Sequence, residues 1–442
     1  MKYGRLVAWV LIVLGAPTQA ADLVDVFRQA QSADAVYAGA RASWAAAQEK
    51  IPQGRAGLLP QASLTATTQY NDRNLSFRAP VQPLVNSPFN SNAITLSIAQ
   101  PILRRQNMLA YEQAKSQVTQ ADAVFAQAAQ DLIVRVSQAY FDVLLAQDNV
   151  ALANAQKAAI SQQLEQAKRN FEVGTATITD THEAQARYDL TVSQEIAAQN
   201  DLEIKRRTLE QIIAVAAPAL APLNTRLQLK PPEPASVDLW VEEARRENLQ
   251  VKAAEVGVTF AAQTVERNRA GHWPTLDAVA SYSDTAQGAG VQTSVGFETK
   301  TKAIGLQLAI PIYQGGLVNS QVREALANED KARQDLENAR RTAELNARQS
   351  YLGVSNGLAQ VQALEAALVS SESQLESTRL GQQVGVRTQV DVLNAQQQLY
   401  TARRDLAQAR YNYVLSLLKL KAAIGQLTEA DVARVNQWLG AS

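Results

Sequence analysis

The chain contains few residues of the kinds that carry out catalysis. Its two histidines, His182 and His272, stand far apart and there is no cysteine, so we expect neither a metal site nor a nucleophilic thiol. The glycines of 288–296 lack the lysine and the strand-to-helix context of a phosphate loop. The sequence also has no G-x-S-x-G or H-E-x-x-H motif. These absences predict no enzyme activity and no cofactor.

The charged residues of most interest belong to a motif that occurs twice. FEVGTATITDTHEAQ, at 171–185, returns as QQVGVRTQVDVLNAQ, at 382–396. The offset of 211 residues is constant between them and relates Asp180 to Asp391. The same offset pairs Tyr140 with Tyr351 further upstream. We therefore predict one structural unit written twice, over 21–230 and 231–442.

The positions of proline indicate two long helical regions. None of the 14 prolines falls in 102–217 or 312–442, and proline inside a helix costs about 3 kcal/mol. Apolar residues recur there at heptad spacing, as in coiled coils. Gly174 can end one helix and Thr177 or Thr179 can begin the next. Each motif is therefore predicted to form the tip of a long helical hairpin, near 173–180 and 384–391.

Residues before each hairpin follow the period of a β-strand. Apolar and small or polar residues alternate near 92–101 and 303–311, and less clearly near 62–71 and 275–283. The segments between them, 72–91 and 284–301, are expected to be loops. Strands of this length and alternation are typical of outer-membrane barrels. Four strands cannot close a barrel, and open edges are costly in lipid, so the chain must complete the barrel with copies of itself.

The beginning of the chain predicts export. Lys2 and Arg5 precede a short apolar run, and small residues end at Ala20, which is the pattern of a secretory signal peptide over 1–20. The 42 basic and 42 acidic residues cancel, and this balance argues against nucleic-acid binding. With no cysteine, a lipid anchor on the mature chain is also not expected.

Several stretches together resemble the TolC family of outer-membrane exit ducts. They are ADLVDVFRQAQSADA at 21–35, KIPQGRAGLLPQASL at 50–64, PIYQGGLVNSQV at 311–322 and the two motif copies. The resemblance implies a homotrimer with a twelve-stranded outer-membrane barrel, four strands per chain, continued by a long α-helical barrel in the periplasm of a Gram-negative bacterium. Each repeat would contribute a helix, two barrel strands and one hairpin, and the second would end in a C-terminal equatorial segment.

The family resemblance also implies a gate at the hairpin tips. Arg387 and Asp391 fall on the positions of the family's constriction arginine and first acidic ring, and Asp180 on that of the aspartate that the arginine bridges. Two positions depart from the pattern: Gln383 replaces the gating tyrosine, and Asn394 replaces the second acidic ring. A closed state held differently and a less negative entrance are expected. Threefold symmetry would gather three Asp391 carboxylates, attract cations and raise the pKa of the ring.

The same resemblance gives the duct its partners. An inner-membrane pump of the ABC or RND type and a periplasmic adaptor (membrane fusion protein) would open the entrance. The expected adaptor contacts are the tip residues Val173, Gly174, Thr175, Val384, Gly385 and Val386. The duct would serve a tripartite efflux pump or a type I protein secretion system as a passive conduit.

Simpler interpretations stay open at this point. Asp180 and Asp391 could act only as helix caps, and Arg387 could be a solvated loop charge. A periplasmic adaptor also contains a helical hairpin joined to β structure, but adaptors typically carry one hairpin and an inner-membrane anchor. A coiled-coil scaffold would leave the alternating strands unexplained.

Overall fold

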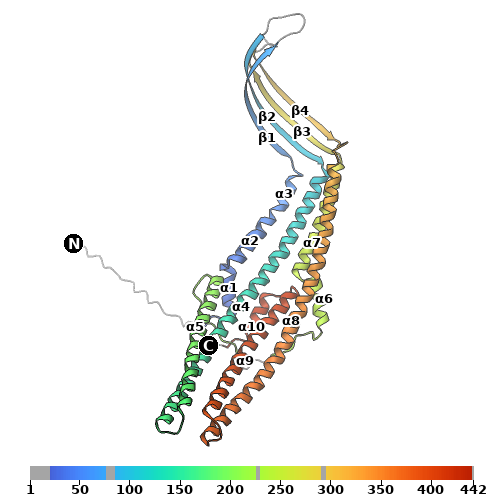
Figure 1. Ribbon diagram of the computed structural model, residues 1–442. Coiled ribbons are helices and arrows are strands. Elements are labelled where there is room, and N and C mark those ends of the chain that lie inside the picture. Colours follow the sequence, from blue (N-terminus) through green and yellow to red (C-terminus); the bar gives the residue numbers. More distant parts are fainter. Residues whose placement is uncertain (1–19, 76–84, 225–228, 290–294, 441–442) are drawn as a thin grey trace, which may run out of the picture. The chain divides into compact units, whose positions relative to one another are not determined.

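The computed structural model describes residues 20–75, 85–224, 229–289 and 295–440 (Figure 1). The expected signal peptide lies outside the described residues, except for Ala20. The chain divides into two compact units. One comprises Met1–Arg41, Phe125–Val251 and Arg340–Ser442 and is called the hairpin unit below; the other comprises Ala42–Val124 and Lys252–Ala339 and is called the sheet unit.

The sheet unit contains four antiparallel strands in the order β1-β2-β3-β4 (Figure 1). Their bounds are Gln61–Leu75, Val85–Leu103, Thr275–Gln287 and Phe297–Ala309. The central pairing of β2 with β3 joins strands that are far apart in the sequence. Every residue of β4 is exposed, and among the described residues β1 and β4 each pair along one side only. Both edges of the sheet are therefore open in the single chain.

The strands are longer than their alternation predicts, and the expected loops are correspondingly shorter. β2 begins at Val85, within the expected loop 72–91, and β4 begins at Phe297, within 284–301. Pro88 lies inside β2 opposite Asp72. A proline fits there because β2 pairs with β3 only from Ser91 onward, so the missing N–H faces the unpaired side of the strand.

Short helices lead the chain into the sheet. Helices α1 (Leu23–Ala33), α2 (Ala35–Gln48) and α3 (Lys50–Ala56) precede β1, while α6 (Val237–Glu247), α7 (Leu249–Arg269) and the 3-10 turn η1 (Ala270–His272) precede β3. At the end of β2, the Arg104 guanidinium donates two hydrogen bonds to the Asp277 carboxylate on β3, at 2.8 and 2.6 Å. This bidentate pair fixes the start of the next helix against the sheet.

Two helical hairpins dominate the hairpin unit. Helix α4 (Arg105–Glu172) turns into α5 (Ile178–Ile213), and α8 (Leu317–Gln383) turns into α9 (Gln389–Ala423). Helices α4 and α8 both begin in the sheet unit. The turns of the two hairpins lie at the same end of the hairpin unit (Figure 1). Among the described helices, none is both long enough and apolar enough to cross a membrane.

Inside each hairpin, small and branched apolar residues pack between the two helices. Leu164, Ala167 and Ala184 form a buried cluster near the first turn. Leu375, Val392, Ala395 and Leu399 form one near the second. The second hairpin is also linked by ion pairs one heptad apart, from Arg403 to Glu372 at 2.9 Å and from Arg410 to Glu365 at 2.7 Å. The heptad spacing thus places both apolar and charged partners across the hairpin.

The connecting segments of the hairpin unit are held by buried polar contacts. Tyr140 is fully buried on α4 and donates its hydroxyl to the carbonyl of Ala221 at 2.8 Å. Arg135 makes a bidentate ion pair with Asp34, at 3.0 and 2.8 Å. Asp34 also accepts the backbone N–H of Tyr37, at 2.6 Å. These contacts fix the start of the chain and the α5–α6 connection to the middle of α4.

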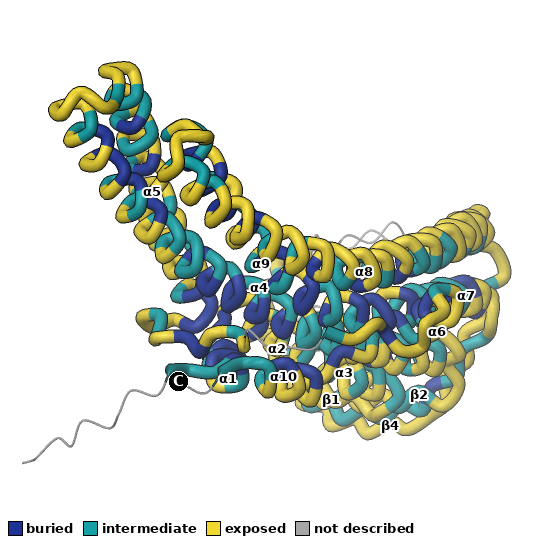
Figure 2. The backbone as a smooth tube through the Cα atoms, turned by 90° about the horizontal axis from the view of Figure 1, so that it is seen from below, coloured by how far each residue is buried: buried dark blue, intermediate teal, exposed yellow. Residues whose placement is uncertain are grey.

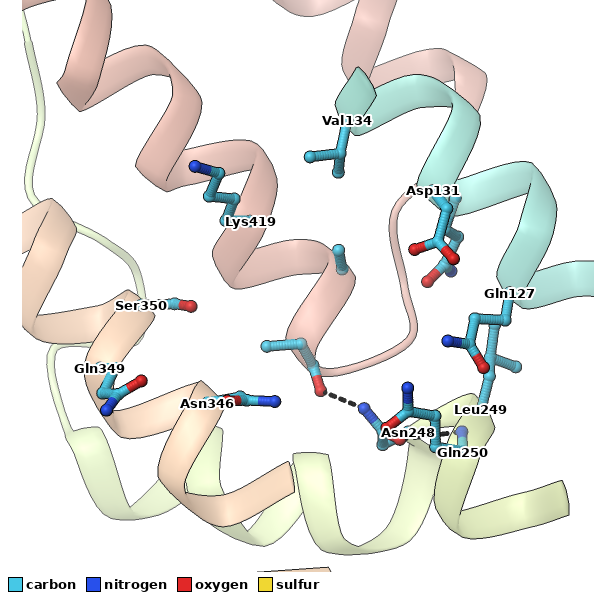
Figure 3. Close-up of a pocket in the computed structure, with 13 residues that line it drawn as sticks. Gln127, Asp131, Val134, Asn248, Leu249, Gln250, Asn346, Gln349, Ser350 and Lys419 are labelled. Atoms are coloured by element: carbon cyan, nitrogen blue, oxygen red, sulfur yellow. Dashed lines mark hydrogen bonds between the residues drawn. The ribbon is translucent and has the colours of Figure 1, made fainter. Parts of the chain in front are cut away.

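Helix α9 ends at a tight junction with α6 and α7. Gly425 has φ of +73°, and a Cβ there would lie 2.4 Å from the carbonyl oxygen of Glu247. Asn248 donates its side-chain amide to the Ala423 carbonyl at 2.8 Å (Figure 3). Its own Oδ1 accepts the backbone N–H of Gln250 at 2.9 Å, which caps the start of α7. The C-terminal helix α10 (Glu429–Asn436) follows this junction and packs against α1.

Candidate entrance site at the hairpin turns

The first hairpin turn ends one helix with glycine and starts the next with a capping box. Gly174 has φ of +76°, a conformation that residues with a Cβ rarely adopt. Thr177 then caps α5 through its hydroxyl, which accepts the Asp180 backbone N–H at 3.3 Å. In return, Asp180 Oδ2 accepts the Thr177 N–H at 2.9 Å and its hydroxyl at 2.8 Å. The Asp180 carboxylate is therefore held by local bonds.

The second turn has the same geometry 211 residues later. Gly385 has φ of +79°. Thr388 caps α9, with its hydroxyl 3.2 Å from the Asp391 backbone N. Asp391 Oδ2 accepts the Thr388 N–H at 2.9 Å and its hydroxyl at 3.0 Å. The helices on either side also end and begin at matching positions, Glu172 with Gln383 and Ile178 with Gln389.

These contacts give the two aspartates a structural role inside a single chain. Hydrogen bonds from the Thr388 backbone and hydroxyl lower the pKa of the Asp391 carboxyl below its ordinary value, and the charge of Arg387 acts in the same direction. The rise in pKa expected of an acidic ring is opposite in sign, because it requires three carboxylates that a single chain does not bring together. Asp391 is accordingly ionised in the single chain at neutral pH.

Arg387 lies four residues before Asp391 in the sequence and is exposed. Within the described part of the chain it forms no ion pair, and it does not reach Asp180. Gln383, the last residue of α8, is exposed and lines a groove of about 510 Å³ between α8 and α9. The charged group at Arg387 and the amide at Gln383 are therefore both free to meet another molecule.

Asn394 has a partner that the sequence did not suggest. Arg187, on α5, donates from Nη2 to Asn394 Oδ1, on α9, at 3.0 Å. Arg187 lies two helical turns past Asp180, and Asn394 lies one turn past Asp391. Arg187 is seven residues after Asp180, so the two lie on the same face of α5. This spacing is the one feature of the sequence that could have indicated Arg187 as a residue near the entrance.

The tips expose apolar side chains to solvent. Val173, Val384 and Val386 are 73%, 67% and 78% exposed. Figure 2 shows the turns as exposed, with buried residues appearing along the faces where paired helices meet. Isolated exposed valines are ordinary, but three that cluster on two neighbouring turns form a surface suited to a protein partner.

A pocket in the hairpin unit lies away from the turns. This pocket of about 300 Å³ lies beside Asn248, and its lining includes several carboxamides together with Asp131 and Lys419 (Figure 3). Burial raises the pKa of Asp131. Among the described residues, no group of three or more histidine, cysteine or acidic side chains is placed to hold a metal ion.

The family model for outer membrane efflux proteins matches residues 27–215 and 240–426, which is most of the chain and covers both hairpins. The chain belongs to this family. Members of the family form transport ducts, and this membership excludes the adaptor and scaffold interpretations. The chain is an outer-membrane exit duct.

Individual relatives agree with the family assignment. The chain is 36% identical to the outer membrane protein TolC of Vibrio cholerae, with 96% of this chain and 95% of the relative aligned. It is 32% identical to the alkaline protease secretion protein AprF of Pseudomonas aeruginosa, with 98% and 92% aligned. These full-length matches confirm the resemblance to the TolC family and the outer-membrane location.

The fold is also that of solved outer-membrane proteins. The crystal structure of the outer membrane channel CmeC of Campylobacter jejuni superimposes with a TM-score of 0.79, at 16% identity, over 100% of this chain and 98% of that one. A second solved structure, VceC of Vibrio cholerae, gives a TM-score of 0.75 at 18% identity. At these identities the likeness concerns the fold alone.

Proposed function

We propose that three copies of the chain assemble into one duct, with a twelve-stranded barrel and a continuous helical tunnel. The observation that carries this proposal is the sheet with two open edges. β1 and β4 each leave a row of backbone N–H and C=O groups without a strand partner among the residues that the structure describes, and in hydrocarbon each such group costs several kcal/mol. Pairing β4 of one copy with β1 of the next satisfies both rows. The doubled hairpin then gives each copy two pairs of helices for the tunnel wall.

The entrance of this tunnel is formed by the hairpin turns. Asp391 occurs once per chain, so a threefold axis gathers three carboxylates. Arg387 has no ion-pair partner among the described residues of its own chain and is available to a carboxylate such as Asp180 of a neighbouring copy. Asn394 and Gln383 lie near the same turn and have uncharged side chains. The entrance therefore carries less negative charge than two rings of acidic residues would give it.

The exposed tips are the docking points of the other components. These docking points are exposed and present valine side chains to a periplasmic adaptor; they comprise Val173, Gly174 and Thr175 on one turn, and Val384, Gly385 and Val386 on the other. The adaptor and an inner-membrane pump of the ABC or RND type open the entrance, while the duct itself is passive. The pump selects the cargo, so the duct serves a tripartite efflux pump or a type I protein secretion system.

The gate can be tested by single-channel conductance of the purified protein in a planar bilayer, with a divalent cation added on the periplasmic side. The decisive pair of variants is D391N and D391A. Asparagine keeps a side-chain oxygen that can accept the Thr388 N–H but is neutral, whereas alanine removes both this capping-box acceptor and the charge. We expect cation block in the wild type and loss of block in both variants. If D391N were blocked as strongly as the wild type, Asp391 would be only a cap.

Assembly is tested separately by electrophoresis of the unheated and heated protein in dodecyl sulfate. A band of about three chain masses that falls to one chain mass on heating supports the trimer. A protein that migrates as one chain before heating, although folded by circular dichroism, would contradict it.

A further inference from the structure

The last turn of α8 contains a glycine that lies directly beneath Arg387. A Cβ built on Gly381 would lie 2.7 Å from Cγ of Arg387 and 3.4 Å from its Cβ. Non-bonded carbon atoms do not approach to 2.7 Å. Cγ lies only two bonds from the Arg387 Cα, so it cannot move aside as the far end of the side chain could. A side chain at position 381 would therefore force Arg387 out of its present χ1 rotamer.

Backbone geometry alone does not require glycine at this position. Gly381 is absent from the residues with positive φ, unlike Gly385 in the same turn. Glycine inside a helix costs about 1 kcal/mol relative to alanine, and Gly381 lies two residues before the helix ends. What glycine provides at this position is therefore space for the Cβ and Cγ atoms of Arg387.

The first hairpin turn acts as an internal comparison. The residues 211 positions earlier are Asn170 and Ala176. The two turns share one backbone bond: the Asn170 carbonyl accepts the Thr175 N–H at 2.8 Å, and the Gly381 carbonyl accepts the Val386 N–H at 2.8 Å. The Gly381 carbonyl also accepts the Arg387 N–H, at 3.1 Å. A full side chain at 170 is accommodated where the later residue is alanine. Glycine therefore occurs in the turn that contains an arginine six residues later, and asparagine occurs in the turn that contains an alanine there.

We propose that Gly381 is a positioning residue for Arg387. Because Gly381 has no side chain, Cβ and Cγ of Arg387 can lie against α8. This contact fixes the χ1 rotamer of Arg387 and so limits the positions that its guanidinium can reach. This inference rests on the proposed gate role of Arg387. In the first turn, Asn170 has no corresponding role, since Ala176 has no group to direct.

The test is a double-mutant cycle read by single-channel conductance in a planar bilayer. The variants are G381A, R387A and the double variant, with N170A as the matched control in the other turn. We expect R387A to raise the conductance of the closed duct, G381A to reproduce that increase, and the double variant to match R387A alone because the two act through one side chain. N170A should behave as wild type. Circular dichroism checks that all four variants keep their helix content.

The outcomes separate the inference from the proposed function. If R387A leaves the conductance unchanged, the gate role of Arg387 is wrong and the inference falls with it. If R387A raises the conductance but G381A does not, the gate stands and the positioning role is wrong. If the effects of G381A and R387A add, or if N170A acts as strongly as G381A, glycine affects the turn itself and not the arginine.

Discussion

Arg187 on α5 and Asn394 on α9 are joined by a hydrogen bond of 3.0 Å, which links the two hairpins of one chain near their turns. The acceptor is a neutral amide, so the bond is weaker than an arginine–carboxylate pair would be. Because both residues lie near the proposed entrance, this bond stabilises the arrangement of the hairpins in the single chain. In the proposed gate, this bond is an internal contact that would have to break if docking of a partner separates the two hairpins.

The strength of this contact should control how readily the entrance opens. N394D replaces a neutral acceptor by a charged one, which adds an attraction between opposite charges to a hydrogen bond whose donor is already ionised. We expect N394D to lower the closed-state conductance and R187A to raise it, measured in planar bilayers. In the R187A background N394D should no longer lower the conductance. A decrease of equal size there would show that the new charge acts on the ions themselves.

Removing the threonine caps should loosen the turns without unfolding the chain. T177A and T388A each remove a hydroxyl that accepts the first free N–H of a helix, and loss of such a cap costs about 1 kcal/mol. Hydrogen exchange of the amides in the first turn of α5 or α9 should accelerate in the corresponding variant only. The serine variants T177S and T388S keep the hydroxyl and are the controls. Equal exchange in the alanine and serine variants would contradict the capping role.

The pH dependence of stability should report the pair of Asp34 and Arg135. The hydrogen bonds from Arg135 hold the pKa of the Asp34 carboxyl below its ordinary value of 3.8. A lowered pKa in the folded state stabilises the fold above the ordinary value, and this stabilisation is lost as the pH falls through the folded pKa. The wild type should therefore lose thermal stability below about pH 4. The melting temperature can be measured by circular dichroism in detergent over this pH range.

The variant D34N separates this pair from other carboxylates. It should be less stable than the wild type at pH 7 by about 1.5–3 kcal/mol, the range for hydrogen bonds to charged groups, and the difference should shrink at low pH. D25N changes an exposed carboxylate whose ion pair with Arg28 spans 4.0 Å, and it should change little. A D34N curve parallel to that of the wild type at all pH values would refute the assignment.

The junction at the end of α9 should tolerate no side chain at Gly425. G425A places a Cβ 2.4 Å from a backbone oxygen and also requires a left-handed conformation, which together should destabilise the protein by about 2–4 kcal/mol. Gly39 is the matched control, because it lies in α2 and an added Cβ would have nothing within 4 Å. G39A should be neutral or stabilising by about 0.5–1 kcal/mol. Similar melting temperatures for the two variants would contradict the tight packing of the junction.

Much of the helical architecture follows from simple local rules. The absence of proline bounds the long helices: α4, from Arg105 to Glu172, lies within the proline-free region 102–217 and ends just before the tip expected near 173–180. Gly174 ends it and Thr177 starts the next one, as the residue types predict. These features depend on backbone sterics and on hydrogen bonds to neighbours within a few residues. They can therefore be recognised in a single sequence.

Features that depend on distant partners were not predictable. The strands continue past their alternating core because pairing with a neighbour extends them, as with Pro88 at the unpaired side of β2. Arg187 and Asn394 are 207 residues apart, and nothing in either local sequence names the other. In the sequence alone, Gly381 is one more glycine near a helix end. Its role depends on the rotamer of Arg387, which only the folded turn determines.

The open edges of the sheet have a consequence for inheritance. A single copy is not stable in hydrocarbon, because its two edge strands leave backbone N–H and C=O groups unpaired there. Insertion into the membrane should therefore be coupled to association of the copies. If three copies assemble as proposed, a cell that makes an altered copy beside an intact one would build mixed rings, and most ducts would contain at least one altered turn at the shared entrance. A leaky variant at the turns should therefore behave as genetically dominant. A variant that cannot pair its edge strands would be left out of every ring and should be recessive.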